Sequence, residues 1–340
     1  MKKIIILAIL FTSFNALAQD PQFSQYYQAP LYLNPGFTGI TPQQRLVVNH
    51  RIQWPSLPQA FSTYAASYDI FVNELRSGFG VLFTTDKMGS AGWRTTTASL
   101  LYSYKVKLTS KLVFSPGLSF GYGSNGLDRT KLSMGDGLEY NGTSLDPALS
   151  KLSNQNYLDF GSGFLLYTKT LWLGASFMHM NQPNLSVLGE VSRLPMKTSI
   201  HGGIRINLSG YRATNRPSYL TPSFIYRMQG PTFSQLDLGV NYHVDPISIG
   251  FWYRGKPFKR SVVNSIEQDA FIVFLGLYFK NLSVGYSYDF TISKLQTAAG
   301  GAHEISLIYE FSAKNPDKKS KKKYKLIPCP TFNSKEGFWN

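Results

Sequence analysis

Residues 282–290, Leu-Ser-Val-Gly-Tyr-Ser-Tyr-Asp-Phe, alternate large apolar side chains with small or polar ones. A period of two places the two sets on opposite faces of a β-strand. One face carries aliphatic and aromatic groups, and the other carries Ser, Gly and Asp. Such a strand fits between an apolar and a polar environment, as in the wall of a membrane barrel.

The same alternation recurs in segments of about ten residues, separated by Gly, Asn, Pro, Ser and Lys. The number of segments is even, as in the antiparallel barrels of single-chain bacterial outer-membrane proteins. We predict fourteen strands, at residues 45–54, 60–72, 77–86, 94–108, 111–123, 157–168, 171–181, 197–208, 219–228, 234–244, 247–255, 269–279, 281–290 and 303–312.

The connections between these strands fall into two classes. Short ones, such as 109–110 and 280–281, predict periplasmic turns. Longer ones at 124–156, 182–196 and 256–268 predict external loops. With an even strand count, the first strand begins and the last strand ends on the periplasmic side.

The composition agrees with a barrel in a membrane. Charged residues are 16% and aromatic residues 15% of the 340 residues, with a formal net charge of +15. A disordered chain would be richer in charge and poorer in aromatics. A mean hydropathy of −0.14 argues against a polytopic helical membrane protein. A soluble β-sandwich is the alternative, but its outer face would need more charge. The sequence predicts an all-β fold, a transmembrane antiparallel β-barrel of outer-membrane type with about 14 strands.

The N-terminus indicates export. Lys2 and Lys3 precede an apolar run, and Ala16-Leu17-Ala18 has the small-x-small pattern of a signal-peptide cleavage site. We expect cleavage near Ala18 and a mature protein in the outer membrane. Cys329 is the only cysteine, so no intrachain disulfide is possible. The predicted parts are a signal peptide (1–18), an N-terminal segment (19–42), the barrel (43–312) and a Lys-rich periplasmic tail (313–340).

The N-terminal segment is aromatic but lacks strand alternation, and an open channel would not need it. We expect it to plug the lumen through Phe23, Tyr26, Tyr27, Tyr32, Asn34 and Pro35. A flexible lead-in to the first strand is the alternative.

Charged side chains also occur on the polar faces of the predicted strands. Unpaired charge away from water is costly, so we expect these groups to pair across the lumen, although a wide porin would keep them hydrated. The candidate lumen charges are Arg51, Lys105, Arg205, Arg227, Arg254, Asp237 and Asp289, joined by Asp69 and Asp159.

Two regions are candidates for partner binding. The loop at 124–156 is long and holds apolar side chains that a solvated loop would not need. Its candidate extracellular contacts are Leu127, Leu132, Met134, Leu138, Tyr140 and Leu145. The tail carries eight Lys against two acidic residues, so we expect it to contact an acidic partner or a membrane face, or to stay solvated. Its candidate contacts are Lys318, Lys319, Lys321, Lys322, Lys323 and Lys325. An exported protein meets little nucleic acid, so no nucleic-acid partner is predicted.

Signs of enzyme chemistry are weak. The five histidines are scattered over different strands without metal-ligand spacing. No G-x-S-x-G elbow is present, and Ala299-Gly300-Gly301 lacks the Lys-Ser/Thr of a phosphate loop. We predict no cofactor, no metal and no enzyme activity. A hydrolase that assembles Ser and His across strands stays as an alternative.

Six separated motifs resemble one family in their order along the chain. They lie at residues 19–39 (including Leu-Asn-Pro-Gly-Phe-Thr-Gly at 33–39), 51–55 (Arg-Ile-Gln-Trp-Pro), 67–69, 174–183 (ending His-Met-Asn-Gln-Pro), 285–289 and 303–307. Over about 19–312 the chain resembles the PorP/SprF outer-membrane proteins of the type IX secretion system.

The resemblance implies a function that composition and periodicity do not. It implies a non-enzymatic barrel that supports type IX secretion and the surface attachment of a secreted adhesin, as in gliding bacteria. The implied partners are the C-terminal domain of a secreted surface protein or adhesin and secretion components in the periplasm and outer membrane, besides the lipid bilayer. A passive porin or a transporter of small hydrophobic solutes is the alternative.

Overall fold

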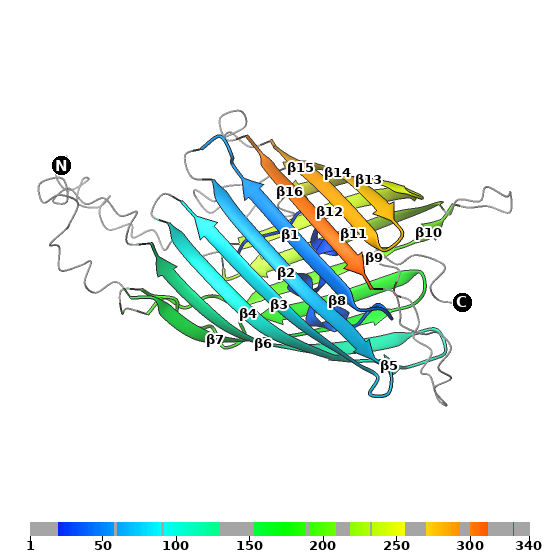
Figure 1. Cartoon of the computed structure of the whole chain (residues 1–340), viewed down its shortest axis with the longest axis horizontal. Coiled ribbons are helices and arrows are strands. Elements are labelled where there is room, and N and C mark those ends of the chain that lie inside the picture. The colour runs from blue at the N-terminus through cyan, green and yellow to red at the C-terminus, as the bar shows by residue number, and fades with distance from the viewer. Residues whose placement is uncertain are drawn as a thin grey trace, which may run out of the picture.

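The chain folds into one antiparallel sheet that closes on itself, as a computed structural model shows (Figure 1). The structure describes residues 20–57, 60–89, 92–128, 153–187, 189, 191–208, 218–231, 233–255, 270–292, 300–311 and 329. The strands are β1 (Arg45–Gln53), β2 (Phe61–Val72), β3 (Ser77–Met88), β4 (Trp93–Tyr104), β5 (Val106–Lys107), β6 (Val113–Leu127), β7 (Gln155–Tyr167), β8 (Leu171–Met178), β9 (Lys197–Ile204), β10 (Ile206–Asn207), β11 (Ser218–Gln229), β12 (Phe233–Val244), β13 (Ile247–Gly255), β14 (Ala270–Phe279), β15 (Leu282–Thr291) and β16 (Ala302–Glu310).

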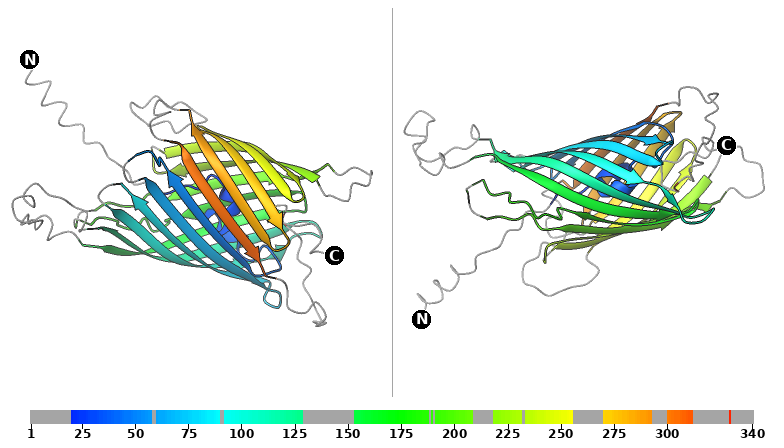
Figure 2. Two further views of the ribbon diagram at one scale, coloured as in Figure 1. Left: turned by 45° about the horizontal axis from the view of Figure 1, so that its top comes forward. Right: turned by 90° about the horizontal axis from the view of Figure 1, so that it is seen from below.

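These sixteen strand segments cross the wall of the barrel fourteen times. β5 continues β4 past Lys105, and β10 continues β9 past Arg205, so each pair crosses the wall once. Neighbours along the chain pair with each other, and the ring closes because β16 pairs with β1. The predicted 14-strand antiparallel barrel is confirmed, and Figure 2 shows its closed wall from two further sides.

The strand ends differ from prediction mainly at one long connection. β6 runs to Leu127 and β7 begins at Gln155, so residues 124–127 and 155–156, which we expected in a loop, are strand. Leu127 pairs with Trp93 and is half-buried in the wall. The other candidate extracellular contacts, Leu132 to Leu145, lie outside the described residues, as do the signal peptide and the tail lysines 318–325.

The burial pattern is the reverse of that in a soluble protein. Along β15, Tyr286 and Phe290 are exposed on the outer face, while Gly285, Ser287 and Asp289 are buried inside. The outer face bears large apolar side chains in the same way on neighbouring strands, as with Leu100, which is 65% exposed. An apolar exterior around a polar interior fits a barrel in lipid.

The two rims of the barrel differ. We call the rim with the connections 73–76, 245–246 and 280–281 the turn end. The opposite rim carries the connections 128–154, 179–196 and 256–269 and is called the loop end.

Residues 20–41 run through the lumen from the loop end to the turn end, where β1 begins (Figure 2). They form three short helices, η1 (Tyr26–Gln28), α2 (Pro30–Leu33) and η2 (Pro35–Phe37). In the described part of the chain, no helix has the length and apolar character to cross a membrane. We call residues 20–41 the lumen segment.

Candidate functional site

At the loop end, the lumen segment begins in a cluster of four charged side chains. His179 Nε2 lies 2.7 Å from Asp20 Oδ2, and its Nδ1 lies 2.9 Å from Asp159 Oδ1. Lys197 Nζ lies 3.3 Å from the same oxygen of Asp20. His179 directly follows β8 with a φ of 56°, so a left-handed turn ends the strand and brings the ring back over the lumen. We call these four residues the loop-end cluster.

The pKa values of His179 and Asp20 favour the charged forms of these two side chains, while burial lowers the pKa of Lys197. Burial disfavours charge on His179, but the two carboxylates outweigh burial and raise its pKa to about 10. Burial also disfavours charge on Asp20, yet His179 and Lys197 hold the pKa of that carboxyl well below its ordinary value. The first residue of the lumen segment is therefore held by two cations.

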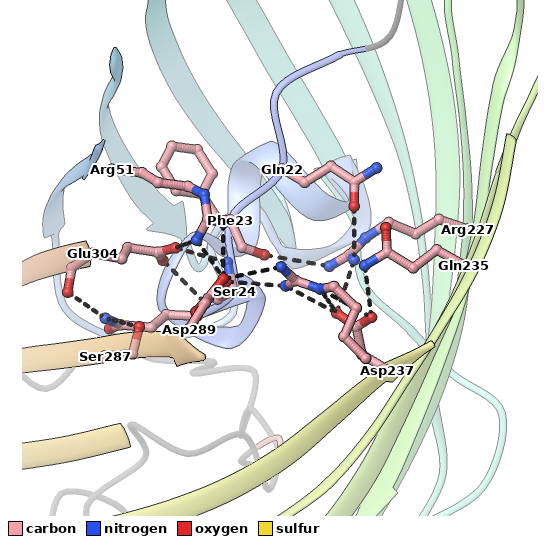
Figure 3. A network of polar contacts seen from close by, with 12 residues as sticks. Gln22, Phe23, Ser24, Arg51, Arg227, Gln235, Asp237, Ser287, Asp289 and Glu304 are labelled. Atoms are coloured by element: carbon pink, nitrogen blue, oxygen red, sulfur yellow. Dashed lines mark hydrogen bonds and ion pairs between the residues drawn. The ribbon is translucent and has the colours of Figure 1, made fainter. Parts of the chain in front are cut away.

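Midway through the lumen, the wall meets Ser24 and Gln25 with a network of ions (Figure 3). The Ser24 and Gln25 backbone N–H groups donate to Glu304 at 2.7 and 3.0 Å. The Ser24 hydroxyl donates to Asp289 at 2.6 Å and accepts from Arg51 at 2.6 Å and from Arg254 at 3.0 Å. The hydroxyl of a single serine thus connects three strands of the wall, β1, β13 and β15.

The charges of this network are matched. Arg51 bridges Asp289 and Glu304, Arg254 bridges Asp237 and Asp289, and Arg227 pairs with Asp237, all at 2.8–3.2 Å. Each of the six residues is at most 5% exposed. Three arginines face three carboxylates, so no large net charge is buried and each ion has a partner. We call Ser24, Gln25 and these six residues the central network.

At the turn end, the wall binds the backbone of the lumen segment. Lys105 Nζ donates to the carbonyls of Gly36 at 3.1 Å and Thr38 at 2.9 Å. Asp69 accepts from the Gly39 N–H at 2.8 Å and pairs with Arg45 at 2.9 Å. These bonds satisfy backbone groups that would otherwise be buried without partners.

Asn34 joins two helices of the lumen segment to the wall. Its Oδ1 accepts from the Gly36 N–H at 2.8 Å as the cap of η2. Its Nδ2 donates to the carbonyls of Phe164 and Ala175 in the wall, each at 3.0 Å. One side chain therefore caps a helix and fixes its distance from two strands.

Packing is tight around the segment. Tyr27 stacks on Trp252 with 5.5 Å between the ring centroids, and Phe274 meets Tyr27 edge-on. A Cβ at Gly78 would clash with the Thr38 carbonyl, and one at Gly117 would clash with the backbone of Pro35. Both wall positions need glycine because the lumen segment touches the wall backbone there.

A cavity lies on the loop-end side of the lumen segment. This small cavity of about 20 Å³ lies among Phe23, Tyr26, Tyr32, Lys197 and Arg227. That volume holds about one water molecule.

The connection 179–196 also folds into the loop-end opening of the lumen. Leu185 and Leu194, from the connection 179–196, pack with Tyr157 as a buried cluster, and Asn125 donates to the Leu185 carbonyl at 2.9 Å. We expected the connection 182–196 to be an external loop. In the structure Leu185, Val187 and Leu194 are buried at the loop end of the lumen, while Val191 and Met196 of the same connection are exposed.

The structure brings most of the predicted site residues together. Phe23, Tyr26, Tyr27, Asn34 and Pro35 are buried inside the barrel, and Tyr32 is half-buried against Phe23. Five of the candidate lumen charges belong to the central network, namely Arg51, Arg227, Arg254, Asp237 and Asp289, and Lys105 lies at the turn end. Arg205 stands apart, with its guanidinium 4.3 Å from the ring centre of Tyr219.

Sequence reasoning missed several partners of these residues. Glu304 lies with Ser306 on the inward face of β16, so the alternation of that strand was the signal that could have identified it. Asp20, Ser24 and Gln25 carry no alternation signal because they precede the first strand. His179 lies within a motif that we had noted, but its role depends on a contact across 159 residues. Among the described residues, no group of His, Cys, Asp and Glu has the arrangement of a metal site.

Comparison with known proteins agrees with this architecture. The family model described as type IX secretion system membrane protein PorP/SprF matches residues 15–309. No curated protein sequence matches the chain.

Solved structures with a similar shape are membrane barrels. One is the toluene transporter TodX of P. putida, with 11% identity, a TM-score of 0.50, and coverage of 84% of this chain and 94% of that one. Another is the KdgM porin, with 9% identity, a TM-score of 0.35, and coverage of 78% of this chain and 99% of that one. At 11% identity, the likeness to TodX shows the fold alone.

Proposed function

Because the chain belongs to the PorP/SprF family of type IX secretion system membrane proteins, we propose that it supports secretion as a plugged, non-enzymatic outer-membrane barrel. In this role it binds other proteins at its two rims and does not conduct solutes. The lumen segment is the plug.

The single observation that carries the proposal is the anchoring of the lumen segment along its whole length. Ion pairs or hydrogen bonds hold it at Asp20, at Ser24 and Gln25, and at Gly36 to Gly39. A conducting pore would have to release buried, matched charges in the central network, and leaving one ion of a buried pair without its partner costs several kcal/mol. A barrel with a fixed plug is better suited to holding partners than to passing solutes.

In the proposed orientation the turn end faces the periplasm and the loop end faces the outside. The secreted partner, an adhesin-like surface protein, docks through its C-terminal domain on the connection between β6 and β7. Leu127 and the apolar residues 132–145 are its proposed contacts. In the connection 179–196, Leu185, Val187 and Leu194 are buried, whereas Met180, Val191 and Met196 are exposed. The support for the β6–β7 connection as the docking loop is therefore its length and its apolar content.

The proposed periplasmic contact is the basic stretch Lys318 to Lys325. It offers positive charge to secretion components with acidic surfaces. Because exposed charges are screened over about 8 Å at physiological salt, this association should weaken as salt is raised.

A passive porin or a transporter of small hydrophobic solutes is the second candidate. The observation that favours it is the fold likeness to TodX, whose title names it a toluene transporter. The small cavity beside Tyr26 and Tyr32 would then be part of a solute pathway that opens when the lumen segment moves.

The test is affinity capture of the tagged barrel from native membranes, with and without residues 130–150. We expect a secreted surface protein to co-purify with the intact barrel and to be lost with the deletion. Removal of 257–268, another loop-end connection, serves as the matched control and should leave capture unchanged. Equal capture by all three proteins would contradict docking on the β6–β7 connection, and capture of no secreted protein would favour the transporter.

A further inference from the structure

Two basic side chains lie opposite each other on the outer face of the barrel, near the loop end. Lys87 on β3 pairs in register with Arg94 on β4, and both are exposed. Directly opposite residues of antiparallel strands have Cβ atoms about 5 Å apart, and like charges so placed destabilise the sheet. Neither side chain has an ion-pair or hydrogen-bond partner within the described residues, Asp128 at the nearby end of β6 included. We call Lys87 and Arg94 the cation pair.

The wall around the cation pair offers hydroxyl groups. Ser62 on β2 is opposite Lys87, and Tyr64 on the same strand is opposite Thr85. Thr85 and Thr96 are opposite each other, with their hydroxyl oxygens 3.1 Å apart, on the turn-end side of the cation pair. We call these four residues and the cation pair the outer polar patch.

The register rows through this patch lack negative charge over seven neighbouring strands, several of which lie side by side in Figure 1. The outward residues of β15, β16, β1, β2, β3, β4 and β6 are Tyr288, His303, Ile52, Ser62, Lys87, Arg94 and Gly126 in the row of the cation pair, and Tyr286, Ile305, His50, Tyr64, Thr85, Thr96 and Ser124 in the next. Neither row contains a carboxylate. The anion that would balance the cation pair is therefore not supplied by these two rows.

Toward the turn end, the same two strands become apolar on their outer face. Phe83 follows Thr85 along the outward face of β3, and Leu100 lies beyond Thr96 on β4. Phe83 is 48% exposed and Leu100 is 65% exposed. Outward side chains of one strand are about 7 Å apart, so Lys87 is about 13 Å from Phe83 along the strand. The order from rim to mid-wall is cation, hydroxyl and hydrocarbon, which is the complement of an anionic membrane lipid.

We propose that the outer polar patch binds a phosphorylated lipid of the leaflet at the loop end. A phosphate lies between Lys87 and Arg94, and the acyl chains lie along Phe83 and Leu100. The phosphate supplies the missing negative charge, and the guanidinium of Arg94 can donate two hydrogen bonds to it. In the orientation proposed above, this leaflet is the outer one, and the ligand is an acylated, phosphorylated sugar lipid of the lipid A type. The inference is independent of secretion, because it requires only the barrel and its bilayer.

The rim beside the cation pair leaves room for a headgroup. β3 and β4 are joined by residues 89–92, which are Gly-Ser-Ala-Gly. Gly89 and Gly92 have φ values of 63° and 64°, the left-handed conformation that favours glycine, and a Cβ at Gly89 would meet nothing within 4 Å. A phosphate with its sugar can therefore approach the cation pair past Gly89.

Native mass spectrometry of the full-length barrel, released from detergent micelles, tests the proposal. The probes are diphosphoryl lipid A and the same lipid stripped of both phosphates. We expect the diphosphoryl form to bind at least about tenfold more tightly, because hydrogen bonds between charged groups are the strong ones. Equal binding of the two lipids would overturn the proposal. So would displacement of diphosphoryl lipid A by inorganic phosphate at equal concentration, because the site would then recognise free phosphate.

Variants locate the site. Lys87→Gln combined with Arg94→Gln should weaken the binding of diphosphoryl lipid A about tenfold and leave the binding of the phosphate-free lipid unchanged. Lys111→Gln combined with Lys169→Gln removes two exposed lysines at the turn end and is the matched control, which should bind as the wild type does. Heat-modifiable migration shows that each barrel is folded. Unchanged binding by the first double variant, or an equal loss in the control, would overturn the assignment.

Stability without lipid gives an independent readout. In micelles free of phosphorylated lipid, Lys87→Gln combined with Arg94→Gln relieves the repulsion between opposed cations. Its urea midpoint should therefore be no lower than that of the wild type. A lower midpoint would mean that the protein itself stabilises the cation pair, and the case for an external anion would fail.

Discussion

Asp237 and Asp289 each lie between two arginines inside the lumen. Asp237 is 3.0 Å from Arg227 and 3.2 Å from Arg254, and Asp289 is 2.8 Å from Arg51 and 3.1 Å from Arg254. Because these arginines are buried away from water, each carboxylate is needed to offset the desolvation cost of the arginines beside it. The strength of the lumen contacts therefore depends on charge matching at single residues.

We predict that Asp237→Asn destabilises the folded barrel strongly. The amide keeps the shape but leaves Arg227 and Arg254 with too little negative charge, which should cost about 3–5 kcal/mol. Urea unfolding of the protein in detergent micelles measures the change. Glu74→Gln removes a carboxylate from an exposed turn and should leave the midpoint unchanged. Similar midpoints for both variants would mean that the central network contributes little.

The loop-end cluster predicts a pH dependence whose sign follows from the two pKa shifts. The pKa of His179 rises from 6.5 to about 10 on folding, so its contribution is complete below pH 6.5 and is lost as the pH rises to about 10. The pKa of Asp20 is lowered from 3.8, so its contribution is present above pH 3.8 and declines below it. The cluster should hold the lumen segment best between about pH 4 and 6.5.

Urea midpoints measured from pH 5 to pH 10 test this prediction. The wild-type midpoint should fall over the upper part of the range, and His179→Gln should lack that part of the fall while sharing the effects of other groups. Parallel curves for the two proteins would show that His179 is not protonated in the folded state.

At the scale of the elements, each strand has one face toward lipid and one toward the lumen. On β15, Val284 points outward and Ser283 inward. Arginine at position 284 would place a cation in the membrane and should cost about 2–4 kcal/mol. Ser283→Arg should cost much less, because the half-buried position lies near the turn end of the lumen and can reach water. Folding of both variants into vesicles of one lipid composition gives the comparison, and equal losses would reverse the assignment of the faces.

The strands could be predicted from the sequence because their signal is local. A period of two needs only neighbouring residues, and it gave the faces of β12 and β15 with the correct inward charges, Asp237 and Asp289. Strand ends were less certain, as at Leu127, because a strand can extend into residues that read as loop. The fourteen crossings followed from the same alternation.

The contacts of the lumen segment were harder to predict from the sequence. The partners of Ser24 are 230 to 280 residues away in the sequence, apart from Arg51, and nothing local marks them. The burial of Leu185 and Leu194 depends on Tyr157 and on the width of the mouth.

At the scale of the whole molecule, the interior is polar and ionic and the exterior is apolar. The lumen segment completes the interior by supplying backbone N–H groups, aromatic rings and one serine to side chains from the wall. We therefore expect the barrel to be closed in its resting state. The central claim of this account is that residues 20–38 close the lumen.

Planar-bilayer recording tests that claim most directly. The intact protein should show no large, steady conductance, and the same protein without residues 20–38 should show one, provided that heat-modifiable migration confirms a folded barrel. Deletion of 257–268, which leaves residues 20–38 in the chain, should leave the intact behaviour unchanged. A large and steady single-channel conductance from the intact protein would contradict the plug and favour a porin.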